Sequence, residues 1–117
     1  MNNISLDPNE NAKLRIRELN DDFRQTLVGG TVLFTAGILS LGPRHEASIL
    51  RRIRSFDAFT YDNDPHGEHD FGSFEVADEV IFFKIDYFDL WRAEHSSDPS
   101  NPEVTERVMT IMLANEW

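Results

Sequence analysis

The sequence predicts an α+β domain: a three-stranded, mainly antiparallel sheet with helices packed on one face, in the order α-β-α-β-β-α. Two stretches repeat apolar residues at helical spacing, one before residue 28 and one after Pro43. Between residues 72 and 88, two stretches with strand-like alternation are separated by only three residues, which is typical of a β-hairpin. A chain of 117 residues without cysteine is long enough for a single core, so we expect one domain over residues 1–117.

The first helix is expected to run from about Pro8 to Leu27, after a flexible lead-in formed by residues 1–7. Asp7 suits the N-cap position, and Pro8 suits the first helical position, where the missing N–H of proline is harmless. The apolar face of this helix contains Ala12, Ile16, Leu19, Phe23 and Leu27. Gly29 and Gly30 are expected to end the helix.

A short apolar strand over residues 31–36 follows, because β-branched and aromatic residues favour extended backbone. After a bend over residues 37–42, a second helix is expected to begin at Pro43. Its apolar stripe contains Ala47, Ile49, Leu50 and Ile53, and its polar side carries Arg44, Arg51, Arg52 and Arg54. These four arginines are expected to form a solvated face or to pair with acids elsewhere, and the alternative is a phosphate-binding patch.

The hairpin is expected to consist of strands over residues 72–76 and 80–88, preceded by a loop over residues 60–72. In the second strand, Lys84 and Asp86 interrupt an otherwise apolar face. This indicates either that the face is partly open or that the two side chains pair with each other.

Residues 89–100 are polar and are expected to form a long loop. Asn101 and Pro102 then repeat the pattern of a cap followed by proline, so we expect a third helix from there almost to Trp117. Its apolar face contains Val104, Val108, Ile111 and Met112. No stretch has the length and hydrophobicity of a membrane span or of a signal-peptide core, and we expect a cytoplasmic protein.

The net charge of −10 is concentrated in the second half of the chain. Residues 1–55 contain eight Lys and Arg against six Asp and Glu, a net +2, whereas residues 56–117 contain three against fifteen, a net −12. Direct nucleic-acid binding is not expected, because it requires cations that displace phosphate counterions. The distribution favours a basic protein or a nucleoprotein complex as partner, a bound cation, or a role in solubility alone.

The segment from Phe56 to Tyr87 contains six of the nine phenylalanines and most of the candidate functional residues. The phenylalanines, Phe56, Phe59, Phe71, Phe74, Phe82 and Phe83, are expected to lie in the core. The acids expected to contact a basic partner are Asp57, Asp62, Asp64, Glu68, Asp70, Glu75, Asp78 and Glu79.

A metal site is the alternative interpretation of the same segment. Carboxylate and imidazole ligands would come from Asp62, Asp64, His66, Glu68 and His69, although their spacing matches no known zinc or calcium motif. The Asp, Asn, Pro and Gly residues also favour tight turns, so a purely structural loop is a third interpretation.

The segments FDAFTYDNDPHGEHDFGSFE, FFKIDYFD and TERVMTIMLANEW, with IRELNDDFRQT and TAGILSLGP nearer the start, resemble a small alphaproteobacterial domain family of unknown function. The resemblance extends from about Leu14 to the end, and its specific segment is DNDPHGEHDFG. It implies an origin on plasmids and other mobile elements, among antirestriction-like neighbours. It implies no established reaction, so no catalytic residue is transferred to this chain.

Three functional hypotheses follow from these observations. The first is a small acidic binding or inhibitor protein, rather than an enzyme and without a cofactor, that blocks a basic nucleic-acid-binding surface of its partner by charge mimicry. An anti-defence protein, of the anti-CRISPR or anti-restriction type, is the form that the resemblance implies. The second is a metal-dependent hydrolase or metal-stabilised domain built on the loop. The third is a regulatory dimerisation module that uses the sheet surface around Phe82 and Phe88, and the sequence leaves the oligomeric state open.

Overall fold

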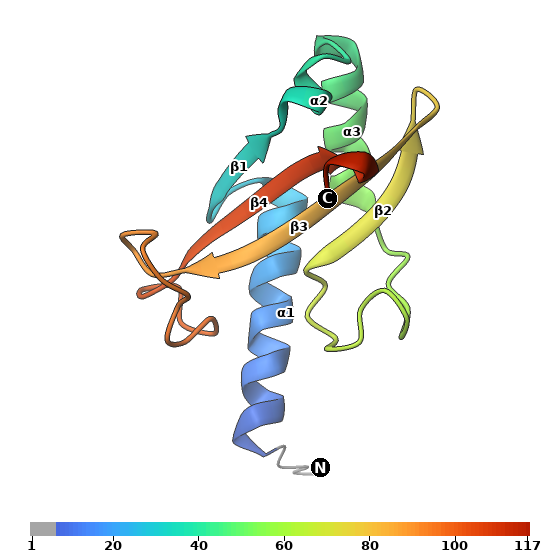
Figure 1. Ribbon diagram of the computed structural model, residues 1–117. Helices are drawn as coiled ribbons and strands as arrows, with labels where there is room; N and C mark the ends of the chain where they lie inside the picture. Colours follow the sequence, from blue (N-terminus) through green and yellow to red (C-terminus); the bar gives the residue numbers. More distant parts are fainter. Residues whose placement is uncertain (1–6) are drawn as a thin grey trace.

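A computed structural model describes residues 7–117 and contains a four-stranded sheet packed against two long helices (Figure 1). In chain order the elements are α1 (Pro8–Thr26), β1 (Thr31–Phe34), α2 (Ala36–Leu39), α3 (Pro43–Ser55), β2 (Phe71–Val76), β3 (Glu79–Phe88), β4 (Glu106–Leu113) and the 3₁₀ helix η1 (Ala114–Glu116). The predicted mixed α+β class is confirmed, whereas the predicted number of strands and the element order are wrong. The lead-in predicted for residues 1–7 lies outside the described residues, apart from Asp7.

The stretch predicted to be the third helix contains strand β4 instead, so that prediction is wrong. The strand order is β1-β4-β3-β2, with β4 parallel to β1 and antiparallel to β3. As a central strand, β4 buries side chains on both faces, including Val108 and Met112 on one and Met109 and Ile111 on the other. Apolar residues on both faces of a strand form a nearly continuous run, which matches helical spacing as well as strand spacing.

Helices α1 and α3 form where the sequence predicts them, each with a proline in its first turn. The Asp7 carboxylate caps α1 by accepting a hydrogen bond of 2.9 Å from the backbone N–H of Glu10. At the other end, Leu27 adopts a left-handed conformation and closes the helix. The predicted bend over residues 37–42 begins with the last three residues of the one-turn helix α2, which Thr35 caps.

Strands β2 and β3 form the predicted hairpin, and β2 lies at the edge of the sheet. The turn consists of Ala77 and Asp78, whose φ angles of 56° and 63° are typical of a two-residue type I′ turn. Val76 and Glu79 pair with each other on either side of this turn. The hairpin register is therefore fixed by its turn.

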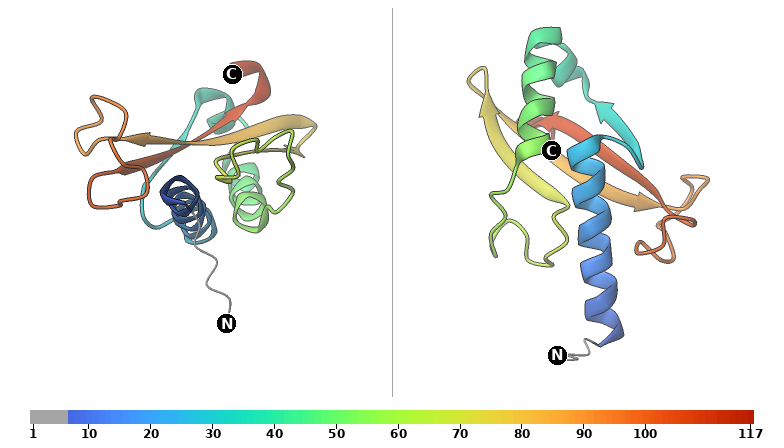
Figure 2. Two further views of the ribbon diagram at one scale, coloured as in Figure 1. Left: turned by 90° about the horizontal axis from the view of Figure 1, so that it is seen from below. Right: turned by 180° about the vertical axis from the view of Figure 1, so that it is seen from behind.

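Helices α1 and α3 cover one face of the sheet (Figure 2, left), and the main core lies between them and the strands. The fully buried side chains of this core are Phe23, Ile38, Ile49, Ile53, Ile81, Phe83, Met109 and Ile111. On the opposite face, the Trp117 ring packs against Phe71 and Phe82, with ring centroids 5.7 and 5.8 Å apart. None of the helices in residues 7–117 is both long and apolar enough to cross a membrane.

Candidate functional site

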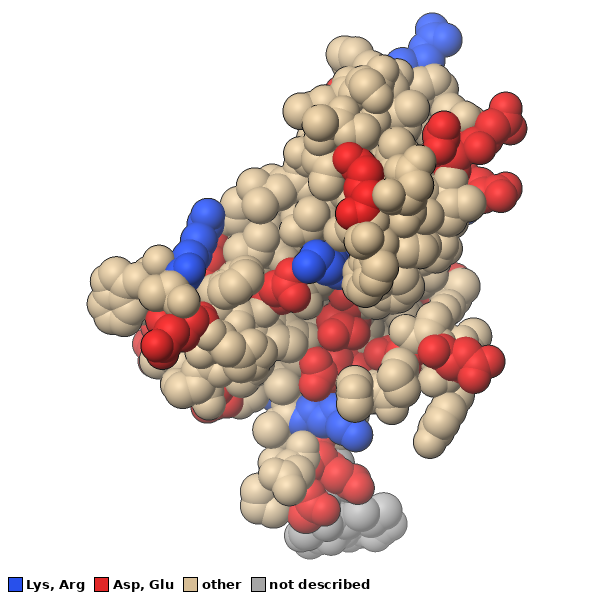
Figure 3. Space-filling view, in the orientation of Figure 1, with Lys and Arg blue, Asp and Glu red and all other residues tan. Residues whose placement is uncertain are grey.

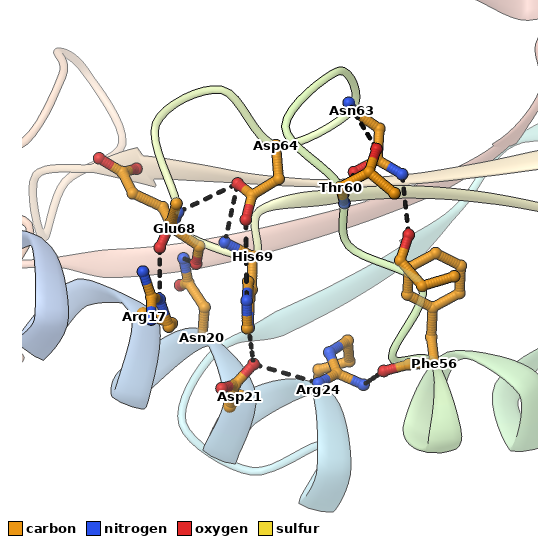
Figure 4. Close-up of polar contacts among 12 residues, drawn as sticks. Arg17, Asn20, Asp21, Arg24, Phe56, Thr60, Asn63, Asp64, Glu68 and His69 are labelled. Atoms are coloured by element: carbon orange, nitrogen blue, oxygen red, sulfur yellow. Dashed lines mark hydrogen bonds and ion pairs between the residues drawn. The ribbon is translucent and has the colours of Figure 1, made fainter.

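The loop over residues 56–70, between α3 and β2, is organised around the carboxylate of Asp64 (Figure 4). Asp64 is only 8% exposed, and its Oδ1 accepts hydrogen bonds from the backbone N–H groups of Glu68 at 3.0 Å and His69 at 3.2 Å. Nearer the start of the loop, the Asn63 side chain accepts a hydrogen bond from the backbone N–H of Thr60. The loop is therefore ordered by its own turn-forming side chains.

His69 joins this loop to helix α1. Its Nδ1 lies 2.8 Å from Oδ1 of Asp21, and its Nε2 lies 3.7 Å from Oδ2 of Asp64. The ring also stacks on Phe59, with centroids 3.9 Å apart and planes inclined by 4°. These contacts hold His69 in a left-handed backbone conformation, φ 57°, that is uncommon for a residue with a side chain. Each ring nitrogen faces a carboxylate, so neither is directed at a ligand.

Arg24 makes the second connection between α1 and the loop. Its guanidinium is almost fully buried and donates to the backbone carbonyls of Ile53 and Phe56 at 2.9 and 2.7 Å, and to Asp21 at 3.1 Å. One arginine thereby fixes the end of α3 and the start of the loop against α1. These three hydrogen bonds to Nη1 and Nη2 compensate for burying the charge, while Nε is buried without a partner in residues 7–117.

A chain of buried polar groups continues from the loop into the sheet. The Asn20 amide accepts from Arg107 Nε at 2.9 Å and donates to the Tyr87 hydroxyl at 2.8 Å, and that hydroxyl donates to the Glu68 carboxylate at 2.7 Å. Burial, followed by the hydrogen bond to Glu68, raises the pKa of Tyr87 far above its usual value. Burial likewise lowers the pKa of Arg107.

Sequence reasoning missed this buried chain, although one signal was present. Asn20 occupies a position at helical spacing from Ile16 and Phe23, both of which are buried. An amide on the buried face of a helix indicates an internal hydrogen-bond partner. Nothing in the sequence pattern named Tyr87 and Arg107 as those partners, because they lie on two different strands.

The eight acids predicted to contact a partner fall into three sets. Asp64 and Glu68 hold the loop through the contacts described above. Asp64 is buried rather than exposed, and its predicted contact with a partner stays a prediction. Asp70 is partly buried, and burial together with the nearby Glu68 carboxylate raises its pKa. Within residues 7–117, the remaining carboxylates form no hydrogen bond or ion pair; they belong to Asp57, Asp62, Glu75, Asp78 and Glu79, here called the acidic rim.

The acidic rim comes from two segments of the chain, one before edge strand β2 and one that includes its end. Asp57 and Asp62 belong to the loop that enters the strand, whereas Glu75, Asp78 and Glu79 belong to the hairpin that leaves it. Figure 3 shows acidic side chains gathered at the tip of this hairpin and a separate group over the loop. The rim therefore consists of two acidic groups rather than one continuous patch.

The four arginines of α3 do not neutralise the rim. Arg52 donates to the backbone carbonyl of Glu75 at 3.1 Å, and Arg54 donates to the backbone carbonyl of Gln25 at 2.9 Å. Arg51 donates to the Ser48 hydroxyl, and Arg44 is exposed. No carboxylate in the described part of the chain pairs with any of these four side chains, which form the solvated face that the sequence predicted.

The five candidate metal ligands do not come together as a coordination site. Asp62 and His66 are exposed at the outside of the loop, while Asp64, Glu68 and His69 form the contacts within it. In residues 7–117, no group of three or more His, Asp or Glu side chains has an arrangement that would hold a metal ion. The geometry therefore gives the metal-site alternative no support.

A cavity of about 360 Å³ lies between α1, α3 and the loop. Its walls include Asp21, Arg24, Arg54 and His69, a mixture of both charges. The hydroxyl among its lining residues, that of Ser55, donates to a backbone carbonyl of α3. Within residues 7–117, neither His69 nor Asp21 forms a hydrogen bond to this hydroxyl.

The face of the sheet opposite α1 and α3 carries a cluster of aromatic side chains rather than of acidic ones. Phe71 and Phe82 pack against each other and against Trp117, so the prediction that these two phenylalanines lie in the main core is wrong. Beside them, Lys84 and Asp86 form an ion pair of 3.1 Å, which confirms that they pair. Both side chains of the pair remain more than one third exposed.

The fold and these surfaces define a small α+β protein with a rigid polar loop and an unpaired acidic rim along one sheet edge. A family model described as a protein of unknown function, DUF3768, matches residues 34–116, and the chain belongs to this family. The matched range contains the loop and strands β2, β3 and β4, whereas α1 precedes it. The predicted resemblance to a family of unknown function is thereby confirmed. No curated protein and no solved structure matches the chain.

Proposed function

We propose that this protein is a binding protein whose acidic rim recognises a basic surface of another protein or nucleoprotein complex. The observation that carries the proposal is the absence of any cationic partner for the five rim carboxylates within residues 7–117. Exposed carboxylates without a partner repel one another and destabilise a folded chain, so a cationic partner relieves this repulsion. Four of the five are exposed, and Glu79 is partly exposed.

The rigidity of the loop supports this proposal. Asp57 and Asp62 lie in a loop whose backbone is fixed by Asp64, His69 and Arg24, and the hairpin acids lie next to a tight two-residue turn. Charges on preformed structure lose little conformational entropy on binding. Two fixed acidic groups separated by one strand also select partners by the spacing of their cations.

More specifically, we propose that binding inhibits the partner by charge mimicry, in which the rim carboxylates take the place of phosphate groups. A partner surface that normally binds nucleic acid presents cations to its phosphate groups. The two clusters of rim carboxylates would contact the same cations. The resemblance noted for the sequence favours an intracellular partner from a host defence complex. In this form the protein competes with nucleic acid instead of binding it.

The test uses a rim variant that carries Asp57→Asn, Asp62→Asn, Glu75→Gln, Asp78→Asn and Glu79→Gln. A matched control neutralises five exposed acids elsewhere, Glu10, Glu18, Asp22, Glu94 and Glu103, and so removes the same charge. Proteins captured from a bacterial lysate are compared at low and high salt, and the captured protein is then purified. We expect the rim variant to bind it at least about tenfold more weakly than the control, and salt to weaken wild-type binding.

The competition step completes this test. Wild-type protein should displace a labelled nucleic acid from the purified partner, whereas the rim variant should not. The proposal fails if the rim variant captures the same proteins as the control, or if the affinity is unchanged between low and high salt. The dimerisation hypothesis stays a prediction, which light scattering at high protein concentration tests.

A further inference from the structure

We propose that the outer edge of β2 binds an extended, cation-bearing segment of the partner as an added β-strand. This inference rests on the proposed acidic binding function and names the form of the bound segment. It concerns a main-chain surface that lies between the two acidic groups. Charge contacts at both ends and backbone hydrogen bonds in the middle would then act on the same segment.

The hairpin register shows which backbone groups of β2 are free. In a two-residue hairpin the pair that flanks the turn, Val76 and Glu79, is hydrogen-bonded, and bonded pairs then alternate with non-bonded ones. Gly72 and Phe74 therefore bond to β3. The intervening residues, Phe71, Ser73 and Glu75, direct their N–H and carbonyl groups away from it.

Two hydrogen bonds agree with this assignment. The N–H of Ile85 donates to the carbonyl of Asp70 at 2.8 Å, which continues the bonded series beyond Gly72. Arg52 donates to the Glu75 carbonyl from outside the sheet, which places that carbonyl on the outer edge. Within residues 7–117, no other hydrogen bond reaches the outward groups of Phe71, Ser73 and Glu75.

Apart from Arg52, which bonds to the Glu75 carbonyl, the β2 edge lacks most of the devices that usually protect an edge strand. Its six residues, FGSFEV, contain no lysine, arginine or proline. The side chains of Ser73 and Glu75 are exposed, and Figure 2 (right) shows no helix or strand beyond the outer side of β2. Unpaired N–H and carbonyl groups in such an edge are a template for another extended chain.

The charges around this edge select the occupant. Asp57 and Asp62 belong to the loop that precedes β2 in the chain, and Asp78 and Glu79 belong to the turn and strand that follow it. A segment of about six residues that carries Lys or Arg would place cations near one or both groups. A second copy of this chain is disfavoured, because antiparallel pairing of two β2 edges would place the hairpin acids of one copy beside the loop acids of the other.

The experiment tethers a probe strand to the protein. Trp117 packs against Phe71 of β2, so a tail added after Trp117 starts close to the edge. A ten-residue Gly-Ser linker, about 17 Å in r.m.s. span, is followed by four Lys-Val repeats. The matched tail has four Lys-Pro repeats, which carry the same charge but lack half of the backbone donors. Amide hydrogen exchange is measured at Phe71, Gly72, Ser73 and Phe74.

We expect the Lys-Val tail to slow exchange at Ser73 at least about tenfold, whereas the Lys-Pro tail leaves it fast. Gly72 and Phe74 should be protected with either tail, because they bond to β3. In the Lys-Val protein, Ser73→Pro removes the outward donor and should abolish protection at Phe71, whereas Ser73→Ala should retain it. Protected Gly72 and Phe74 amides show that each variant is folded.

Three outcomes would overturn the strand-addition proposal. Ser73 exchange that stays fast with the Lys-Val tail shows that the edge does not accept a strand. Equal protection by both tails shows that charge alone holds the tail. Slow exchange at Ser73 in the untailed protein, with a dimeric mass by light scattering, shows that a second copy occupies the edge. None of these results depends on the rim and control variants, whose partner capture decides the proposed function separately.

Discussion

Asp62 and Asp64 are two positions apart in the same loop and have opposite environments. The Asp62 side chain is exposed and belongs to the acidic rim, whereas the Asp64 side chain is buried and accepts two backbone hydrogen bonds. The difference arises because the chain turns back after Asp64, so the N–H groups four and five positions later approach its carboxylate. Sequence reasoning predicted a loop rich in turn-forming acids, but it could not assign the inward carboxylate without that turn geometry.

Replacing Asp64 should therefore destabilise the protein, whereas replacing Asp62 should not. We expect Asp64→Ala to lower the free energy of unfolding by about 2 kcal/mol, because it leaves the N–H groups of Glu68 and His69 without their acceptor. The matched substitution Asp62→Ala should stay within about 0.5 kcal/mol of wild type. Urea unfolding measures both, and equal effects would contradict the assigned role of Asp64.

Asp70 gives a pH-dependent prediction. Burial and the Glu68 carboxylate raise its pKa above the ordinary 3.8, so the folded state binds a proton here more tightly than the unfolded state does. This contribution to stability is fully present below the unfolded pKa and is lost as pH rises through the folded pKa. Asp70→Asn, which keeps an uncharged side chain, should therefore be more stable than wild type at pH 7.

The difference between Asp70→Asn and wild type should shrink as pH falls toward 3, because wild-type Asp70 becomes neutral as well. Urea midpoints of both proteins between pH 3 and 7 measure this convergence. Asp57→Asn serves as the control, since Asp57 is exposed in the same part of the fold. A difference in urea midpoint between Asp70→Asn and wild type that is constant across this pH range would contradict the prediction.

Among the elements, those with one buried face were predictable and the one with two buried faces was not. Helices α1 and α3 have a single apolar stripe and clear proline starts, and β3 alternates buried and partly exposed residues along most of its length. Strand β4 is enclosed by neighbours on both edges and by side chains on both faces, so its pattern lacks the period of two. The buried polar chain was missed for a related reason: Asn20, Tyr87 and Arg107 meet only after β4 is placed beside β3.

Close packing of the β2–β3 hairpin on the loop depends on Gly72. A Cβ atom at this position would lie 2.2 Å from the buried Phe83 ring and 2.9 Å from the Phe56 ring. We expect Gly72→Ala to destabilise the fold by about 1–3 kcal/mol through overpacking. Ser73→Ala, at the adjacent exposed position, should change stability by less than about 0.5 kcal/mol, and thermal unfolding of both variants compares them.

At the scale of the whole molecule, the net negative charge and the helices that pack on the sheet come from different halves of the chain. The net −12 of residues 56–117 is carried mainly by the loop over residues 56–70, the β2–β3 hairpin and residues 89–105, yet the sheet that the second half forms is stabilised by α1 and α3 from the less charged half. The helices supply apolar surface and the arginine that fixes the loop, and the later residues supply the exposed carboxylates. Composition alone predicted this excess of acid, but only the fold shows which of these carboxylates are buried, paired or exposed without a partner.

The parallel pairing of β1 with β4 has a consequence for folding during synthesis. Thr31 pairs with Val108, and β4 is the one strand beside β1 within residues 7–117. Once α1, β1 and α3 have left the ribosome, their apolar side chains therefore remain exposed. The strand β1 cannot join a sheet until β4 has been synthesised. Contacts this distant in sequence slow folding, so the nascent chain should stay open to chaperones and proteases through most of its translation.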